Sequence, residues 1–200
     1  MLHLFNAVEI VKAVGLLGII FIIFAESGLL IGFFLPGDSL LFTAGILASQ
    51  GYINIFALSI ASFIAAVAGD NVGYAFGERV GPRLFSRKDS FFFHKDHLER
   101  AKLFFGQHGK KSLILARFVP VVRTFVPILA GVGAMNYRTF FNYNMLGALI
   151  WAVGVSLLGY FLGNVVPDID RYILVIALVI IVISVIPGLI GVIRHRRSKQ

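Results

Sequence analysis

The sequence contains no cysteine and few charged residues, and each shortage narrows what the chain can be. Without cysteine among its 200 residues, the chain forms no disulfide and offers no thiolate for catalysis or metal binding. Only 14% of the residues are charged, whereas 58% are hydrophobic. A soluble globular domain is typically about 45–50% apolar. The composition therefore predicts an all-α integral membrane protein.

Long apolar stretches predict where the chain crosses the bilayer. A helix of about 20 apolar residues spans the roughly 30 Å hydrocarbon core. Four stretches meet this requirement and a fifth is apolar but broken; the four are residues 10–35, 53–77, 139–163 and 171–193, and the broken one is 112–135.

The distribution of basic residues predicts the orientation. Nine Lys and Arg residues lie between Arg79 and Lys111, and the C-terminal segment RHRRSK adds four more. Under the positive-inside rule both regions lie in the cytoplasm. We therefore expect a multi-pass membrane protein with a cytoplasmic C-terminus.

This orientation predicts two re-entrant segments. The stretch 112–135 leaves the cytoplasm and has to return there by Tyr137, so that 139–163 can cross outward. By the same reasoning, residues 27–50 dip into the membrane from the outside. One straight helix across 14–35 is the simpler alternative, and the sequence leaves it open.

Prolines mark the points where these segments are expected to break. Pro36-Gly37 interrupts the first, and Pro120 and Pro127 interrupt the second. Proline removes a backbone donor and clashes with the preceding turn. Non-helical backbone at membrane depth persists only inside protein or beside a cavity.

An internal repeat relates the two halves. Glu26 precedes Pro36 by ten residues, as Arg117 precedes Pro127. Each half then contains an Ala-Gly pair and a span that ends GYAFG or GYFLG. The sequence thus predicts an inverted repeat with two opposed re-entrant helical hairpins, a recurring transporter architecture. The expected layout is a first half over about 10–80, a cytoplasmic linker over about 81–111, a second half over about 112–165, and a C-terminal spanning helix at 171–193 with a basic tail.

The linker segment Ser90–His108 has helical apolar spacing and a charged opposite face, which predicts an amphipathic helix in the headgroup region. Its basic side and the formal charge of +8 favour anionic lipid as a partner rather than nucleic acid. The three histidines in it form no recognisable metal-ligand pattern. We expect no metal, no cofactor and no enzymatic activity, and we leave a homo-oligomer open.

Charged residues at membrane depth identify the expected functional site. Glu26 and Asp38 lie in the first broken segment, and Arg117 and Arg123 lie in the second. Such charges are costly and usually face a protein interior or a water-filled cavity. Guanidinium groups suit the oxygens of a phosphate or carboxylate, so the arginines predict an anionic ligand.

The role of the carboxylates stays open at this point. They can pair with the arginines in the empty site and take up protons when an anionic headgroup displaces them. They can equally be structural partners of Arg117 and Arg123. A third carboxylate at membrane depth, Asp70, is either a proton site or a hydrogen-bond partner of a polar residue such as Asn142 or Asn144.

These residues resemble a known family. The order Glu26, LPGD at 35–38, Gly69-Asp70, RFVP at 117–120, Arg123 and Pro127 is similar to that of the DedA family of bacterial membrane proteins, whose domain is also called the VTT or SNARE-associated domain. The resemblance covers about residues 14–165. It implies a location in the bacterial inner (plasma) membrane, two opposed re-entrant loops and a role in envelope integrity. It also implies translocation of phospholipids or of a polyprenyl phosphate carrier that depends on the proton motive force.

The favoured function is therefore a carrier that moves a lipid phosphate headgroup between leaflets, with undecaprenyl phosphate as the favoured lipid. Arg117 and Arg123 are expected to bind phosphate, and Glu26, Asp38 and Asp70 to couple protons. A proton-coupled small-ion antiporter, a passive phospholipid scramblase and a non-transporting scaffold are the alternatives.

Overall fold

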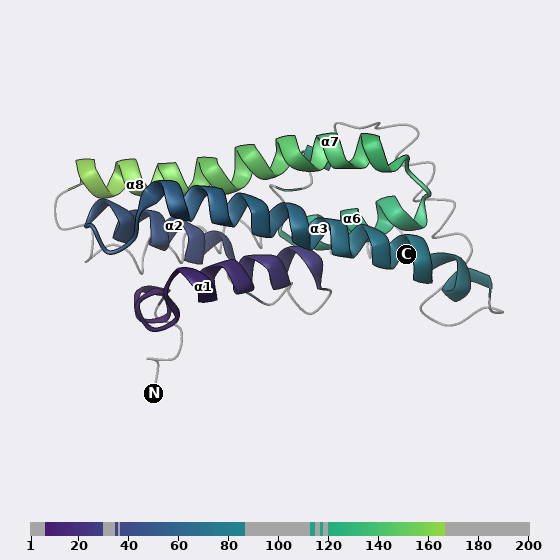
Figure 1. The fold of residues 1–200 in the computed structure, drawn as a ribbon, viewed down its shortest axis with the longest axis horizontal. Coiled ribbons are helices and arrows are strands. Elements are labelled where there is room, and N and C mark those ends of the chain that lie inside the picture. Colours follow the sequence, from purple (N-terminus) through teal and green to yellow (C-terminus); the bar gives the residue numbers. More distant parts are fainter. Residues whose placement is uncertain are drawn as a thin grey trace, which may run out of the picture.

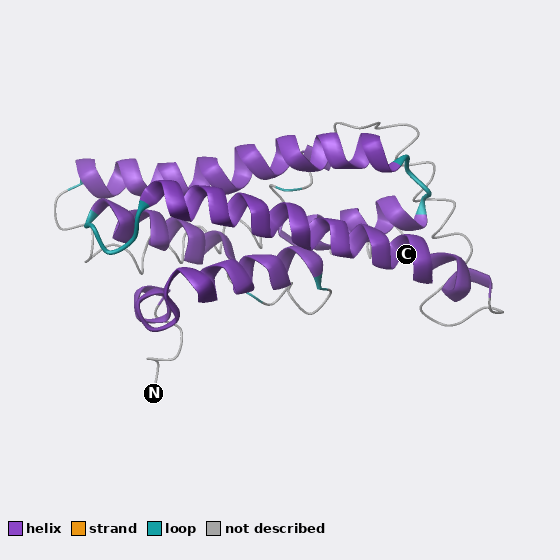
Figure 2. Ribbon diagram, viewed as in Figure 1, coloured by secondary structure: helices purple, strands orange, loops and turns teal. Residues whose placement is uncertain are grey.

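The computed structural model describes residues 7–29, 35, 37–86, 113–114, 117 and 120–166. Side chains are described within these ranges from residue 15 onward, except at 81–86 and 120–121. This part of the chain is helical and contains no strand (Figure 2). Its elements are α1 (Ala7–Gly28), α2 (Gly37–Ser49), α3 (Ile55–Ser86), α6 (Pro120–Val132), α7 (Tyr137–Ala148), a π-helical turn η3 (Leu149–Val153) and α8 (Gly154–Val165).

Two rods are long and apolar enough to cross a membrane. One is the Ile55–Val80 part of α3, with 26 residues, and the other is the continuous α7–η3–α8 rod over Tyr137–Val165, with 29. At about 1.5 Å per residue, both exceed the hydrocarbon thickness of about 30 Å. The helices predicted over 53–77 and 139–163 are thus confirmed as helices.

Helices α2 and α6 have 13 residues each and are too short to cross alone, since 13 residues extend only about 20 Å. Each packs on the long rod of the other half: α2 on α8, and α6 on α3 (Figure 1). The two short helices therefore lie toward opposite ends of the bundle.

Glycines allow the backbones of α2 and α8, and those of α6 and α3, to approach closely. A Cβ on Gly159 would overlap the backbone carbonyl of Phe42 in α2, and a Cβ on Gly77 would overlap that of Ile128 in α6. Phe42 and Ile128 occupy corresponding places relative to the Ala-Gly pairs at 44–45 and 130–131. The same kind of backbone contact thus occurs once in each half.

Each short helix ends in the same kind of turn. The Tyr52 N–H donates to the Leu47 carbonyl at 3.0 Å, with Gly51 at a φ of 83°; the Met135 N–H donates to the Ala130 carbonyl at 3.0 Å, with Ala134 at a φ of 53°. These are left-handed residues at helix C-termini.

Each long helix then begins at an asparagine cap. The Asn54 side-chain oxygen accepts from the backbone N–H groups of Phe56 and Ala57, and that of Asn136 accepts from Arg138 and Thr139. Both asparagines satisfy N–H groups that a helix start leaves unpaired. The order short helix, left-handed turn, asparagine cap and long helix therefore occurs in both halves.

Helix α1 ends earlier than the simpler sequence interpretation allowed. It contains a non-helical glycine at Gly15 and stops at Gly28, and Leu35 lies in a bend. The straight helix across 14–35, and the span over 10–35, are therefore wrong in length. Gly28 rests on the backbone of Gly69 in α3, so a close crossing fixes the end of α1.

Several predictions concern residues that the structure does not describe. These are the break at Pro36, the amphipathic segment Ser90–His108, the span over 171–193 and the basic tail.

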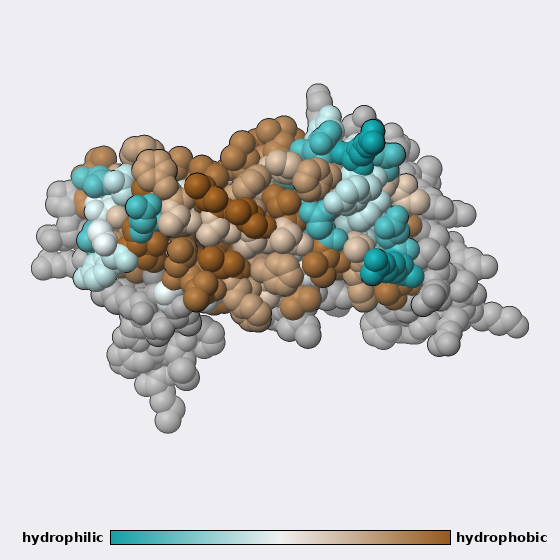
Figure 3. Space-filling view, viewed as in Figure 1, coloured by the Kyte–Doolittle hydropathy of each residue, from teal (hydrophilic) through white to brown (hydrophobic). Residues whose placement is uncertain are grey.

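The surface carries a wide apolar band. In Figure 3 hydrophobic residues cover the middle of the visible face, and hydrophilic residues gather toward both ends. The exposed apolar side chains include Leu17, Phe56, Ile60, Ile64 and Phe161. Water-soluble monomers rarely expose so large an apolar area, whereas a membrane protein presents one to lipid.

Candidate functional site

Five ionisable side chains meet in the interior of the bundle. Glu26 comes from α1, Asp38 from α2, Asp70 from α3, Arg123 from α6, and Arg117 from a turn before α6. Each of them except Asp38 is at most 6% exposed. Buried charges are tolerated only when they are paired, so the pairing decides what the site can do.

Arg123 pairs with both predicted acidic residues. Its Nη1 lies 2.9 Å from the Asp38 Oδ1, and its Nη2 contacts the Glu26 carboxylate. Twelve residues separate the two acids, which a continuous helix would place about 18 Å apart. Because α1 stops and α2 begins again at Gly37, both carboxylates reach the same guanidinium.

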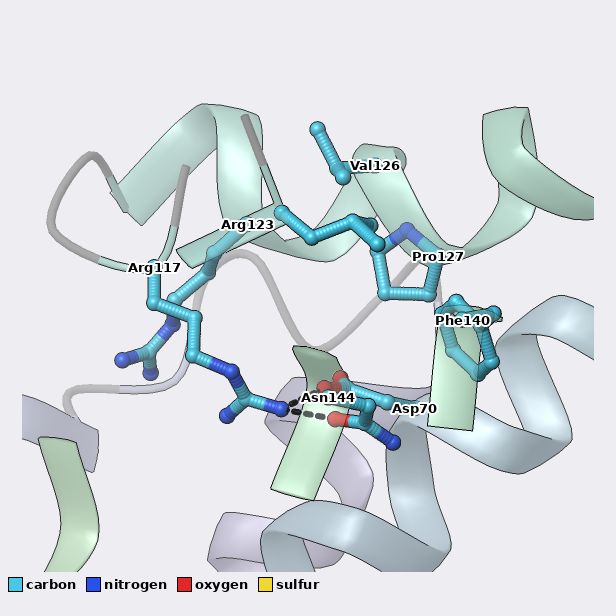
Figure 4. Close-up of a pocket in the computed structure, with 8 residues that line it drawn as sticks. Asp70, Arg117, Arg123, Val126, Pro127, Phe140 and Asn144 are labelled. Atoms are coloured by element: carbon cyan, nitrogen blue, oxygen red, sulfur yellow. Dashed lines mark hydrogen bonds and ion pairs between the residues drawn. The ribbon is translucent and has the colours of Figure 1, made fainter. Parts of the chain in front are cut away.

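Arg117 has separate partners. Its Nη2 donates to the Asp70 carboxylate and to the Asn144 side-chain oxygen, as the dashed lines in Figure 4 show. The Asn144 amide in turn donates to the Val67 carbonyl of α3 at 3.3 Å. Gly147 leaves room for Arg117, since a Cβ there would lie 2.8 Å from the arginine side chain.

Neither of the two interpretations of Asp70 drawn from the sequence named its main partner. Within the described residues, Asp70 is bound to Arg117 instead of directly to Asn144, and Asn142 is exposed. The reason is that Arg117 lies between the two side chains and takes both as acceptors.

Trp151 is a site residue that the sequence analysis missed. Its indole N–H donates to the Asp38 Oδ1 at 2.7 Å, and its ring centroid lies 4.3 Å from the Arg123 Cζ. The second contact is a cation–π interaction. A usable signal existed: Trp151 is the single tryptophan of the chain and lies in mid-span, whereas membrane tryptophans favour the interfaces.

Gly37 and the prolines have distinct positions. Gly37 begins α2 directly beside Glu26, and a Cβ on it would overlap the Glu26 carboxylate. Pro120 begins α6, where a missing N–H costs nothing. Pro127 lies inside α6, so the prediction that it breaks the segment is wrong: the helix continues through it, and the Arg123 carbonyl loses only the donor four residues ahead.

The space beside the arginines is small. A cavity of about 10 Å³ lies among Asp70, Arg117, Arg123, Pro127, Phe140 and Asn144 (Figure 4). A volume of about 10–15 Å³ holds one water molecule, so the cavity is too small for a phosphate group. The Arg123 Nε–H has no hydrogen-bond partner among the described residues. In this conformation the protein's own carboxylates occupy both arginines.

In its described part, a helical bundle with an apolar belt and a buried cluster of carboxylates and arginines defines a helical membrane protein with an internal charged site. The VTT domain model matches residues 35–161, which include all of the cluster except Glu26. Protein DedA of Escherichia coli K12 is 45% identical over 179 residues, covering 88% of this chain and 81% of that protein. The chain belongs to the DedA family.

Two other relatives agree with this assignment. An uncharacterized membrane protein of Mycobacterium tuberculosis H37Rv is 42% identical over 185 residues, or 92% of this chain and 81% of its own length. Inner membrane protein YqjA of Escherichia coli K12 is 34% identical over 143 residues, or 72% of this chain and 65% of its own length. No solved structure gives a significant match.

Proposed function

We propose that this protein is a carrier, and not an enzyme, that moves a lipid with a phosphate headgroup between the leaflets of the bacterial inner membrane. Undecaprenyl phosphate is the favoured lipid, and proton uptake by the carboxylates drives the cycle. The name of the relative YqjA supports the inner-membrane location. The observation that carries the proposal is the occupation of Arg123 by carboxylates from two separate helices.

The carboxylates occupy the positions that phosphate oxygens would take. A guanidinium offers forked donors to carboxylate and phosphate alike. When a phosphate binds Arg123, it has to displace Glu26, Asp38 or both. Among the described residues the Arg123 Nε–H has no acceptor, so it can donate to an incoming phosphate.

Proton uptake follows from the cost of that displacement. Glu26 is 4% exposed, so a freed Glu26 carboxylate would be an uncompensated buried charge. Protonation removes this cost. The described cluster has three carboxylates and two guanidinium groups, a formal charge of −1 when all are ionised, so one proton makes it neutral. Headgroup binding and proton uptake are thereby linked.

The short helices give the site access from both sides. We propose that α2 and α6 are the inner helices of two opposed re-entrant hairpins, which dip from opposite leaflets. Their length of 13 residues and their places toward opposite ends of the bundle support this arrangement. The charged cluster then lies near the middle of the membrane, where α2 and α6 begin.

Reconstitution in liposomes tests the function. Purified wild type is placed in vesicles with labelled undecaprenyl phosphate, and lipid movement is measured with and without a pH gradient. Arg123→Lys and Arg117→Lys are expected to slow movement by about tenfold or more, because lysine keeps the charge but lacks the fork. Arg138→Lys, at an exposed position of α7, is the matched control and should move lipid at the wild-type rate.

Variants of the two acidic residues test whether the carboxylates couple lipid movement to the pH gradient. Glu26→Gln and Asp38→Asn are expected to retain some lipid movement but to lose its response to the pH gradient. Lipid movement in wild type that ignores the gradient would instead identify a passive scramblase. Cation-dependent proton flux without lipid movement would identify a small-ion antiporter, and folded arginine variants with wild-type rates would refute phosphate recognition.

A further inference from the structure

Trp151 occupies an unusual place in the second rod. It is 3% exposed and lies in the π-helical turn η3 between α7 and α8. The neighbouring Leu149 and Ile150 face outward, at 50% and 46% exposure. A π-helical turn is rare and is frequently found at functional sites.

The residues that contact the arginines form one stripe on this rod. Asn144 binds Arg117, Gly147 makes room for it, and Trp151 covers Arg123. Their spacing of three and four residues places them on one helix face. The rod therefore contacts both arginines, Arg117 through the Asn144 amide and Arg123 through the Trp151 ring.

Trp151 binds the same carboxylate oxygen as Arg123. The indole Nε1 lies 2.7 Å and the Arg123 Nη1 lies 2.9 Å from the Asp38 Oδ1. Asp38 therefore has a donor that does not depend on Arg123. The ring face against the guanidinium also restricts its plane, which sets the direction of its forked donors.

We propose that Trp151 is a positioning residue for anion exchange at Arg123. It keeps Asp38 hydrogen-bonded after an incoming phosphate has taken the arginine, and it holds the guanidinium plane in the orientation that the phosphate meets. The proposal rests on the carrier function proposed above and names a residue which that function did not require.

A purely structural role makes a different prediction. Trp151 also belongs to an apolar cluster with Ala66, Ala148 and Ala152. If packing were its only task, phenylalanine would replace it without a specific effect on anion binding, and its surroundings would not change when an anion binds.

Intrinsic fluorescence gives a direct test, because the chain has a single tryptophan. Detergent-solubilised wild type is titrated with a polyprenyl phosphate and, as the matched control, with the corresponding polyprenol. We expect a saturable change in emission with the phosphate and none with the alcohol. Arg123→Lys should shift the midpoint to higher concentration. An emission that does not respond to the phosphate in protein that transports it would overturn the proposal.

Substitution separates the two contacts of the indole. Trp151→Phe keeps an aromatic face and removes the N–H, and Trp151→Leu removes both. Because these variants have no tryptophan, their binding is measured with a labelled polyprenyl phosphate. We expect the concentration of this lipid at half-maximal binding to rise about tenfold in Trp151→Phe, as for a lost hydrogen bond to a charged group, and further in Trp151→Leu. Phe161→Leu, an exposed aromatic on the same rod, should bind like wild type.

A double variant provides the readout that a packing role would not affect. In an Asp38→Asn background, Trp151→Phe should weaken binding much less than in wild type, because the carboxylate that the N–H serves is gone. Equal effects in both backgrounds would overturn the proposal. If wild type shows the emission change but moves no lipid, the carrier function fails while the role of Trp151 in anion binding stands.

Discussion

At the scale of single residues, each buried charge of the cluster depends on a named partner. Asp70 and Arg117 are 5% and 6% exposed and bind each other, so neither has water as a substitute. Removing one member of such a pair leaves the other uncompensated in a low-dielectric interior. Stability is therefore most sensitive to changes that unbalance the pair.

Asp70→Asn is expected to destabilise the protein by about 3–5 kcal/mol, because Arg117 then lacks a counter-charge. Thermal unfolding in detergent, followed by loss of the monodisperse peak in size-exclusion chromatography, measures this. The double variant Asp70→Asn with Arg117→Gln should recover part of the loss. An Asp70→Asn protein as stable as wild type would contradict the pairing.

Gly37 is expected to tolerate no side chain. Gly37→Ala places a methyl group where the Glu26 carboxylate lies, so Glu26 has to move away from Arg123, and lipid movement in the liposome assay should fall about tenfold or more, as for other misplaced site groups. Gly154→Ala is the matched control, since nothing lies within 4 Å of a Cβ there. Equal rates in the two variants would show that the contact between α1 and α2 is not needed.

The sequence identified the charged residues of the cluster but not their pairing. Charges in apolar stretches are visible one at a time, which is how Glu26, Asp38, Arg117 and Arg123 were found. Which acid meets which arginine depends on where α1 stops and how α3 and α7 cross, and no local pattern carries that information. The sequence analysis did not identify Trp151, because an aromatic residue in an apolar span is usually a packing residue.

At the scale of elements, the turns that end the short helices differ in how well their residues suit them. Gly51 adopts its positive φ without steric cost, whereas Ala134 holds a φ of 53° with a Cβ. A left-handed conformation costs a non-glycine residue roughly 1–2 kcal/mol. The turn of the second half is therefore the more strained one.

Ala134→Gly is expected to stabilise the protein by about 1 kcal/mol, after allowing for the greater chain entropy of glycine in the unfolded state. Gly51→Ala should have the opposite effect. The melting temperatures of the two variants and wild type, measured in the same detergent, test both. If Ala134→Gly lowered the melting temperature, the alanine would be making a contact that outweighs its strain.

The helices themselves were largely predictable, but their exact ends were not. Apolar runs located α3 and the α7–η3–α8 rod, since a span needs a minimum length whatever its neighbours are. The end of α1 at Gly28 depends on its close crossing with Gly69, which is a tertiary contact. The π-helical turn has no sequence signal of its own.

At the scale of the whole molecule, the proposed opposed hairpins predict where the two turns lie relative to the membrane. The absence of cysteine makes this easy to test, because single cysteines can be introduced without removing others. Tyr52→Cys lies in the turn after α2 and Arg138→Cys at the start of α7, both at exposed positions.

The membrane-impermeant maleimide is applied to the outer face of the inner membrane while that membrane is intact. Under this condition we expect Tyr52→Cys to react. Arg138→Cys should react only after the membrane is opened. Ser62→Cys, fully buried in α3, is the unreactive control. Labelling of both exposed cysteines from the same side would exclude opposed hairpins.

The exchange of short helices between the halves also bears on how such a protein could arise. Helix α2 rests on α8 and α6 rests on α3, so the two most extensive helix contacts run between the halves. Two separate half-length polypeptides, inserted in the bilayer upside down relative to each other, could make the same contacts as a dimer. Joining their genes would require only a linker and no new interface, after which each copy could specialise, one toward acids and the other toward arginines.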